Sequence, residues 1–183
     1  MNKMIVASVM ALMVLAVPSA ANAEETTCRG TIGGRTVDNL RVPQNASCTL
    51  NGTKVKGTIK VENGARLTAS RVRVIGNVQG ENAASVVLRN SRIGGSVQVV
   101  QGKAARVLSS KVGSDVLFDD QRGRLAANDN EIGGNLQAFQ NTGGLRIFTN
   151  SIDGNLQCKE NNPRPVGGGN VVQGNKEDQC SRL

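Results

Sequence analysis

The chain has 183 residues, of which 22 are Lys or Arg and 14 are Asp or Glu, so its formal net charge is +8. It contains no histidine, tryptophan or tyrosine, and the absence of histidine excludes histidine-based acid–base and triad chemistry. The basic balance favours an anionic partner, while the shortage of aromatic residues disfavours sites that stack bases or sugar rings.

Residues 1–23 have the pattern of a secretory signal peptide. Lys3 precedes an apolar run that ends at Val17, and a small-residue cleavage site follows at Ala21-Asn22-Ala23. The apolar run is too short for a membrane-spanning helix. We therefore expect a secreted or periplasmic bacterial protein whose mature part, residues 24–183, forms a single domain with 21 basic and 14 acidic residues.

Near-copies of one short segment recur along the chain at an almost constant distance. The first copy is Lys54-Val55-Lys56-Gly57-Thr58-Ile59 and the last is Asn150-Ser151-Ile152-Asp153-Gly154-Asn155-Leu156-Gln157. The apolar anchors of the copies are 19, 19, 19, 20 and 20 residues apart, and in chain order they are Ile59, Val78, Val97, Val116, Leu136 and Leu156. A fixed period of this length is typical of a solenoid, in which each unit buries its apolar face against its neighbours.

Aligning the copies on one Ile or Val per repeat places apolar residues in columns. The alignment positions are Val55, Val74, Ile93, Val112, Ile132 and Ile152. Positions seven and five residues earlier, and four and six residues later, are almost all apolar. Apolar residues two apart indicate strands, and the dominant Val, Ile, Asn and Gly are weak helix formers. The sequence therefore predicts short strands stacked in parallel around one interior.

Glycine and polar residues fill the positions between the predicted strands. Glycine occupies one turn position in most copies, as expected where φ is positive or two backbones approach closely; these residues are Gly57, Gly76, Gly95, Gly134 and Gly154, with Ser114 as the exception. We expect two polar columns to bond the turns from coil to coil, namely Thr53, Ser91, Ser110, Asn130 and Asn150, and Asn77, Ser96, Asp115, Asn135 and Asn155. A third column, Gln79, Gln98, Gln137 and Gln157, is predicted to point outward as an amide ladder.

The four cysteines are spaced by about one coil in each of two pairs. Cys28 and Cys48 are 20 residues apart, and Cys158 and Cys180 are 22 apart. Stacked coils lie about 4.8 Å apart, which is within the Cα separation that a disulfide tolerates. We predict the disulfides Cys28–Cys48 and Cys158–Cys180; a zinc site is disfavoured because the chain has no CxxC motif and no histidine.

Both ends of the predicted stack depart from the repeat. The N-terminal unit around Leu40 is irregular and contains Pro43, and a partial C-terminal repeat places Lys176 where the apolar anchor is expected. Such features block strand edges. They favour a monomer over an end-to-end filament.

The columns over residues 35–160 resemble those of a right-handed parallel β-helix, the architecture of the pectate-lyase-like superfamily. Left-handed β-helices, with strict hexapeptides, and bactofilins, with shorter coils, fit less well. The segment from Gly154 to Cys180 also resembles the ending of small secreted bacterial β-helix proteins. These resemblances imply an all-β, right-handed parallel β-helix of about seven coils of 19–20 residues, and they imply no particular activity.

The main candidate binding site is a series of basic residues at repeat spacing. Lys54, Arg73, Arg92 and Lys111 follow one another at 19-residue steps, flanked by Arg71 and Arg89, and a sparser second column is formed by Arg66, Arg106 and Arg146 in alternate coils. Like charges stacked this closely repel one another, and an anionic partner would relieve this electrostatic repulsion. Anionic polysaccharide, lipopolysaccharide and extracellular DNA are the candidate partners. The alternative is that these residues only keep a β-rich surface soluble.

The expected function is a non-catalytic structural or binding role at the bacterial envelope or outside the cell, without a metal or cofactor. One alternative is a self-assembling surface or matrix protein. Another is a small polysaccharide lyase or carboxylate-dependent glycan-degrading enzyme, because the lyases that this fold resembles use acidic calcium ligands with Arg or Lys as base. The acids available for that role are Asp115, Asp119, Asp120, Asp129 and Glu131. They form no adjacent acidic column, although a bend that brings Asp119 to Asp129 would create a carboxylate pair.

Overall fold

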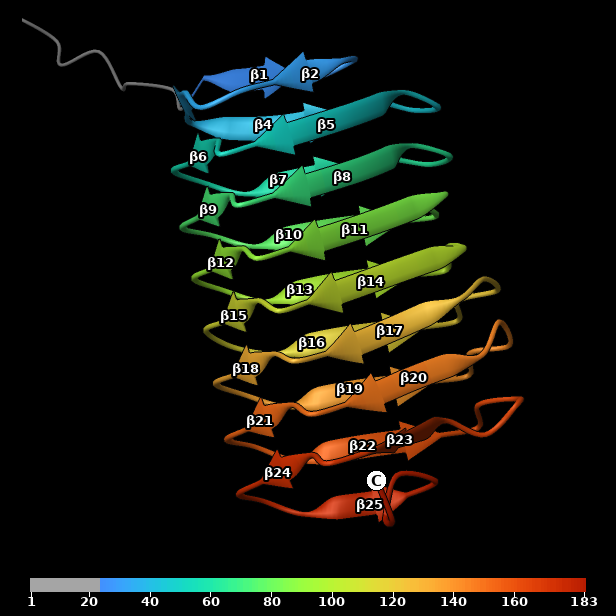
Figure 1. The fold of residues 1–183 in the computed structure, drawn as a ribbon. Coiled ribbons are helices and arrows are strands. Elements are labelled where there is room, and N and C mark those ends of the chain that lie inside the picture. Colours follow the sequence, from blue (N-terminus) through green and yellow to red (C-terminus); the bar gives the residue numbers. More distant parts are fainter. Residues whose placement is uncertain (1–23) are drawn as a thin grey trace, which may run out of the picture.

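The computed structural model describes residues 24–183, and the predicted signal peptide, residues 1–23, lies outside this range. The described chain winds into an all-β, right-handed parallel β-helix whose strands stack along one axis from β1 to β25 (Figure 1). Eight turns, each of three strands, precede the last strand. The prediction of about seven coils left out the first turn, because its sequence departs from the repeat.

Three parallel sheets form the sides of the tube. Sheet A has nine strands: β1 (Glu25–Thr27), β4 (Asn39–Val42), β7 (Ile59–Val61), β10 (Val78–Glu81), β13 (Val97–Val100), β16 (Val116–Asp119), β19 (Leu136–Phe139), β22 (Leu156–Lys159) and β25 (Lys176–Asp178). Sheet B has eight strands: β2 (Thr31–Ile32), β5 (Ser47–Asn51), β8 (Arg66–Ser70), β11 (Ser85–Arg89), β14 (Ala104–Leu108), β17 (Leu125–Asn128), β20 (Leu145–Phe148) and β23 (Val166–Gly168). Sheet C has eight two-residue strands: β3 (Thr36–Val37), β6 (Lys54–Val55), β9 (Arg73–Val74), β12 (Arg92–Ile93), β15 (Lys111–Val112), β18 (Glu131–Ile132), β21 (Ser151–Ile152) and β24 (Val171–Val172).

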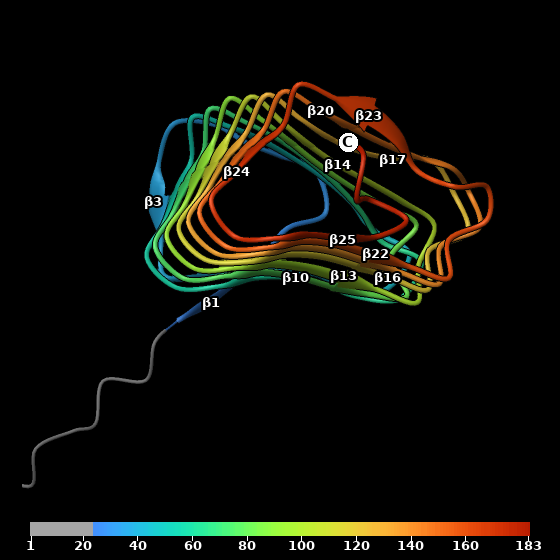
Figure 2. The same cartoon turned by 90° about the horizontal axis from the view of Figure 1, so that it is seen from below.

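The register of the sheets confirms the predicted apolar columns. In sheet A, Val97 pairs with Val78 on one side and with Val116 on the other, and in sheet C Ile93 pairs with Val74 and Val112. These side chains are buried in the single core that runs the length of the tube. Viewed along the axis, sheets A, B and C enclose this core on three sides (Figure 2). Phe118 is fully buried within it, as its column predicts.

The turn glycines are required by close approach and not by a positive φ. A Cβ on Gly134 would lie 2.5 Å from Asp115 Oδ1, and one on Gly76 would lie 2.8 Å from the carbonyl oxygen of Gly57. Positive φ values occur instead at the corners on either side of sheet B, mostly at residues other than glycine such as Arg71, where φ is 52°, and Asn82, where φ is 53°. Of the two reasons given for the glycine column, close packing of successive turns is therefore the correct one.

Buried polar side chains bond each turn to the next, as predicted. Asn130 Nδ2 donates to Asn150 Oδ1 at 2.9 Å, and Asn150 Nδ2 donates to Asn170 Oδ1 at 2.8 Å. In the second column Asn155 N donates to Asn135 Oδ1 at 2.8 Å. The glutamine column forms a ladder at its C-terminal end, where Gln137 Nε2 donates to Gln157 Oε1 at 2.8 Å.

Sequence reasoning missed one further polar ladder, which lies at the corner between sheets A and B. Gln121 N donates to Asn141 Oδ1 at 2.9 Å, Asn141 Nδ2 donates to Asn161 Oδ1 at 2.7 Å, and Asn161 Nδ2 donates to Gln179 Oε1 at 3.0 Å. The first three residues are 20 apart in the sequence. This ladder could therefore have been predicted from the repeat period.

Both predicted disulfides are present, with Cα separations of 5.6 Å for Cys28–Cys48 and 5.2 Å for Cys158–Cys180. Lys176 pairs with Leu156 and stands where the anchor column would continue, and its Nζ donates to the carbonyl oxygen of Asn170 at 2.9 Å. The anchor column thus ends in a charged residue, whose side chain bonds to the backbone of the preceding turn.

Candidate anion-binding surface

Sheet C brings the predicted basic column into register. Arg73 pairs with Lys54 and Arg92, and Arg92 pairs with Lys111, on successive turns of the tube. All four residues are exposed, while the residue that follows each of them in its strand is buried. Since neighbouring parallel strands lie about 4.8 Å apart, four cations follow one another along one edge of the molecule.

An acidic residue ends this column. Lys111 pairs with Glu131 in the sheet C register, and its Nζ forms an ion pair with Glu131 Oε1. Among residues 24–183 no carboxylate forms an ion pair with Lys54, Arg73 or Arg92. The free positive charge is therefore concentrated on the N-terminal three members of the column.

A groove of about 580 Å³ runs beside the column at the corner between sheets B and C. Arg71, Arg92 and Lys111 line it, and Asp129 and Glu131 close its C-terminal end. Arg71 is held at the corner by a bond from its Nη2 to Asn51 Oδ1, at 2.7 Å. The groove is thus basic over most of its length and acidic at one end.

Sheet B adds a second group of arginines. Its eight strands, all within the part of the chain that the structure describes, contain four arginines and no Asp or Glu; the arginines are Arg66, Arg89, Arg106 and Arg146. The nine predicted residues therefore lie on sheet B, on sheet C or at the corner between them. We call this set, Lys54, Arg66, Arg71, Arg73, Arg89, Arg92, Arg106, Lys111 and Arg146, the basic surface.

The predicted second column is wrong in one member. Arg106 pairs with Val87, whereas Arg66 pairs with Ser85, two residues earlier in the same strand. Arg106 and Arg146 do share a column, because both pair with Ala126. Arg66 precedes its alignment residue by eight positions and the other two by six, so it belongs to a different column, which also contains Arg124 and Arg164.

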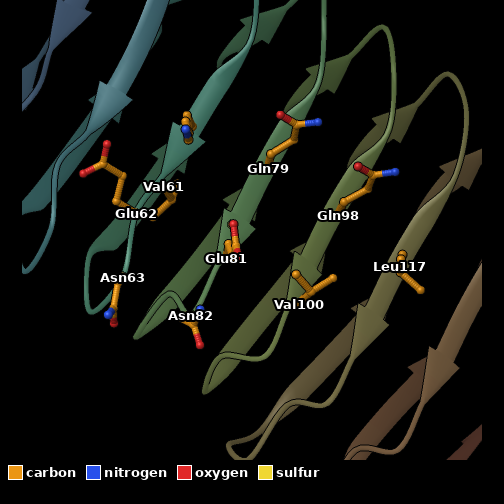
Figure 3. A pocket seen from close by; sticks show the side chains of 11 residues that line it. Val61, Glu62, Asn63, Gln79, Glu81, Asn82, Gln98, Val100 and Leu117 are labelled. Carbon is orange, nitrogen blue, oxygen red and sulfur yellow. The ribbon is translucent and has the colours of Figure 1, made fainter.

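Sheet A differs in charge and carries a groove with a volume of about 690 Å³. Its lining includes two carboxylates on adjacent turns, Glu62 and Glu81, with Gln79 and Gln98 beside them and Val100 and Leu117 at one end (Figure 3). Glu62 is held by Arg41 Nη1 at 3.4 Å. The hydrogen bonds that Arg41 donates to the carboxylates of Glu25 and Glu62 raise the pKa of Arg41 above its ordinary value. Neither glutamate belongs to a predicted column, so the repeat pattern did not indicate this groove.

The carboxylates considered for catalysis do not gather into one site. Asp119 ends a strand of sheet A, while Asp129 lies at the corner between sheets B and C, so the proposed Asp119–Asp129 pair is wrong. Asp115 Oδ1 accepts from Asn135 N at 2.8 Å and belongs to a turn ladder. Asp120 lies 3.9 Å from Arg122 Nη2, and Glu131 pairs with Lys111. Within residues 24–183 no group of three His, Cys, Asp or Glu residues is arranged to hold a metal ion.

The described residues also include no helix that is long and apolar enough to span a membrane. Comparisons with protein-family models, with curated proteins and with solved structures found no match to this chain.

Proposed function

We propose that this protein is a non-catalytic, secreted or periplasmic binding module that holds an anionic polysaccharide along its basic surface. The observation that supports this function best is the in-register column Lys54–Arg73–Arg92, whose three cations are exposed and form no ion pair within residues 24–183. The two disulfides support an oxidising compartment.

A linear polymer fits this surface better than a small ligand. The cations repeat at a spacing of about 4.8 Å along a straight edge, so a chain with regularly spaced negative charges can contact several of them at once. The energetic gain comes from releasing counterions and from relieving repulsion between stacked like charges. The basic surface has the open form that a polymer requires, because its groove lies along a corner and is not enclosed.

Nucleic acid is a poorer fit because base-stacking residues are scarce. Of the three phenylalanines, Phe118 is fully buried and Phe148 lies beneath Arg146, with 5.1 Å between the guanidinium carbon and the ring centroid. Phe139 lies on sheet A, away from the basic surface. Proteins that bind single strands usually stack successive bases on aromatic side chains.

The test is a salt titration of binding to an acidic polysaccharide, with lipopolysaccharide and duplex DNA measured in parallel. We expect tightest binding to the polysaccharide and an affinity that falls steeply with salt. The double variant Arg73→Ala/Arg92→Ala should weaken binding and lower the slope of log K against log salt by about 1 to 2. The matched control, Lys60→Ala/Lys159→Ala, removes the same charge from sheet A and should leave the slope nearly unchanged. The proposal is wrong if the wild-type protein binds none of the three polyanions at low salt, or if both double variants weaken binding equally.

A further inference from the structure

A small hollow on sheet B lies between three arginines that no predicted column contained together. The register Leu125↔Leu145 and Arg146↔Val166 places the preceding residues Arg124, Gly144 and Arg164 above one another on three successive turns. At about 4.8 Å per turn, Arg124 and Arg164 begin about 10 Å apart, with no side chain between them at Gly144. The space amounts to about 270 Å³ and is lined by these residues together with Arg146, Gly143, Leu145, Pro163 and Val166.

Two glycines keep the hollow open. Gly144 has a φ of +82°, which side chains rarely adopt, and a Cβ there would meet only Pro163 Cγ, at 3.8 Å. At Gly143 a Cβ would lie 1.9 Å from the carbonyl oxygen of Gly123, so the backbones of successive turns leave no room for a side chain. The hollow therefore depends on glycine at both positions. Any larger residue there would fill the hollow or distort the stacked turns around it.

The charge of the hollow is not balanced by the protein. Arg124, Arg146 and Arg164 are exposed, and none of them forms an ion pair with any carboxylate of residues 24–183. Arg146 is positioned instead by Phe148, whose ring lies 5.1 Å from the guanidinium carbon. Stacking orients a guanidinium without neutralising it. Three cationic side chains thus line one space, and their exposed charges are available to an anion that binds there.

We propose that this hollow binds a tetrahedral oxyanion, the phosphate or sulfate ester group of a polymer. Guanidinium groups form bidentate, charge-assisted hydrogen bonds to such oxyanions, and three arginines on different sides match a group with several oxygens better than a planar carboxylate. This assignment names the charged group that the proposed polymer carries. It rests on the proposed function only in taking that group to be part of a polymer. The hollow lies on sheet B and shares no residue with the column of sheet C.

The experiment measures binding of inorganic phosphate, inorganic sulfate and acetate to the mature protein by titration calorimetry. We expect phosphate or sulfate to bind and acetate not to bind, and the stronger of the two oxyanions identifies the ester. Arg124→Ala and Arg164→Ala should each weaken that binding about tenfold or more, as expected for loss of a charge-assisted bond. The control Arg122→Ala removes an exposed arginine that pairs with Asp120 and should have little effect. Melting temperatures of the ligand-free variants establish that each is folded.

The outcomes separate this proposal from the polymer-binding function. Arg73→Ala/Arg92→Ala should leave phosphate or sulfate binding intact, while it weakens binding of the polymer. If neither oxyanion binds at millimolar concentration, or acetate binds as well as they do, the hollow is not an oxyanion site even if the polysaccharide still binds to sheet C. Equal weakening by Arg122→Ala and Arg164→Ala would also overturn it, since the effect would then be one of net charge.

Discussion

Lys111 and Glu131 occupy equivalent positions on adjacent turns of sheet C, and their side chains form an ion pair at the C-terminal end of the basic column. Both side chains are about half exposed, so the pair stabilises the fold by no more than about 1 kcal/mol. Its main consequence concerns binding. The pair neutralises Lys111 and ends the column of free cations at Arg92.

Glu131→Gln should therefore extend the free column by one cation. We expect tighter binding of the acidic polysaccharide and a slope of log K against log salt that is steeper by about 1, because one more charge becomes available. Glu81→Gln is the matched control, since it makes the same change in net charge on sheet A. If the two variants strengthen binding equally, net charge and not the column determines the affinity.

Gly134→Val should destabilise the fold by about 2 to 3 kcal/mol, because overpacking forces the turn away from its neighbour. The new Cβ would lie 2.5 Å from Asp115 Oδ1 and 2.9 Å from the carbonyl carbon of Ser114. Thermal and denaturant unfolding measure the effect. Gly168→Val is the control, since nothing lies within 4 Å of a Cβ at that position; similar losses at both sites would contradict the close-approach explanation.

Asn150→Ala should cost about 3 kcal/mol of unfolding free energy, because buried polar groups lose their partners. The Asn150 side chain accepts from the backbone and side chain of Asn130 and donates to the carbonyl oxygen of Ala127, at 2.7 Å, and to Asn170 Oδ1. Denaturant titration at constant pH measures the loss. Asn63→Ala, at an exposed position, should change stability by less than about 0.5 kcal/mol, and an equal effect would show that the ladder is not the cause.

Replacing both Cys158 and Cys180 by serine should lower stability by about 3 kcal/mol, as expected from a closed loop of this length in the chain-entropy model. The sequence separation is 22 residues, and the bridge ties the chain after β25 to β22. Hydrogen exchange should accelerate most in β25, because this strand has a neighbouring strand on only one side. Unchanged exchange in β25 would show that strand pairing alone holds the last turn.

The vertical neighbours in this protein could be read from the sequence because the period of 19 or 20 residues is nearly constant. Once Val74 lies beside Val55, each nearby residue has its partner on the next turn, and the predicted register of Arg73 and Arg92 follows by counting. The same counting also predicts that Asn141 and Asn161, which are 20 residues apart, are neighbours on successive turns, where they form a ladder. Arg66 lies eight residues before its alignment residue and Arg106 lies six before its own, so the same counting assigns them to different columns.

The solenoid, the disulfide partners and the order of residues within each column could be predicted from the sequence, because those features depend only on distance along the chain. How the columns lie around the tube follows only from the folded structure: Asp119 and Asp129 are separated by a whole sheet, the basic residues share sheets B and C, and Gly144 opens a hollow beside Arg146. The physical reason is that the direction of each side chain depends on the angles of the corners, which positive φ values and close backbone contacts between turns establish together. A repeat period specifies which residues stack, and the geometry of the corners specifies which stacks share a surface.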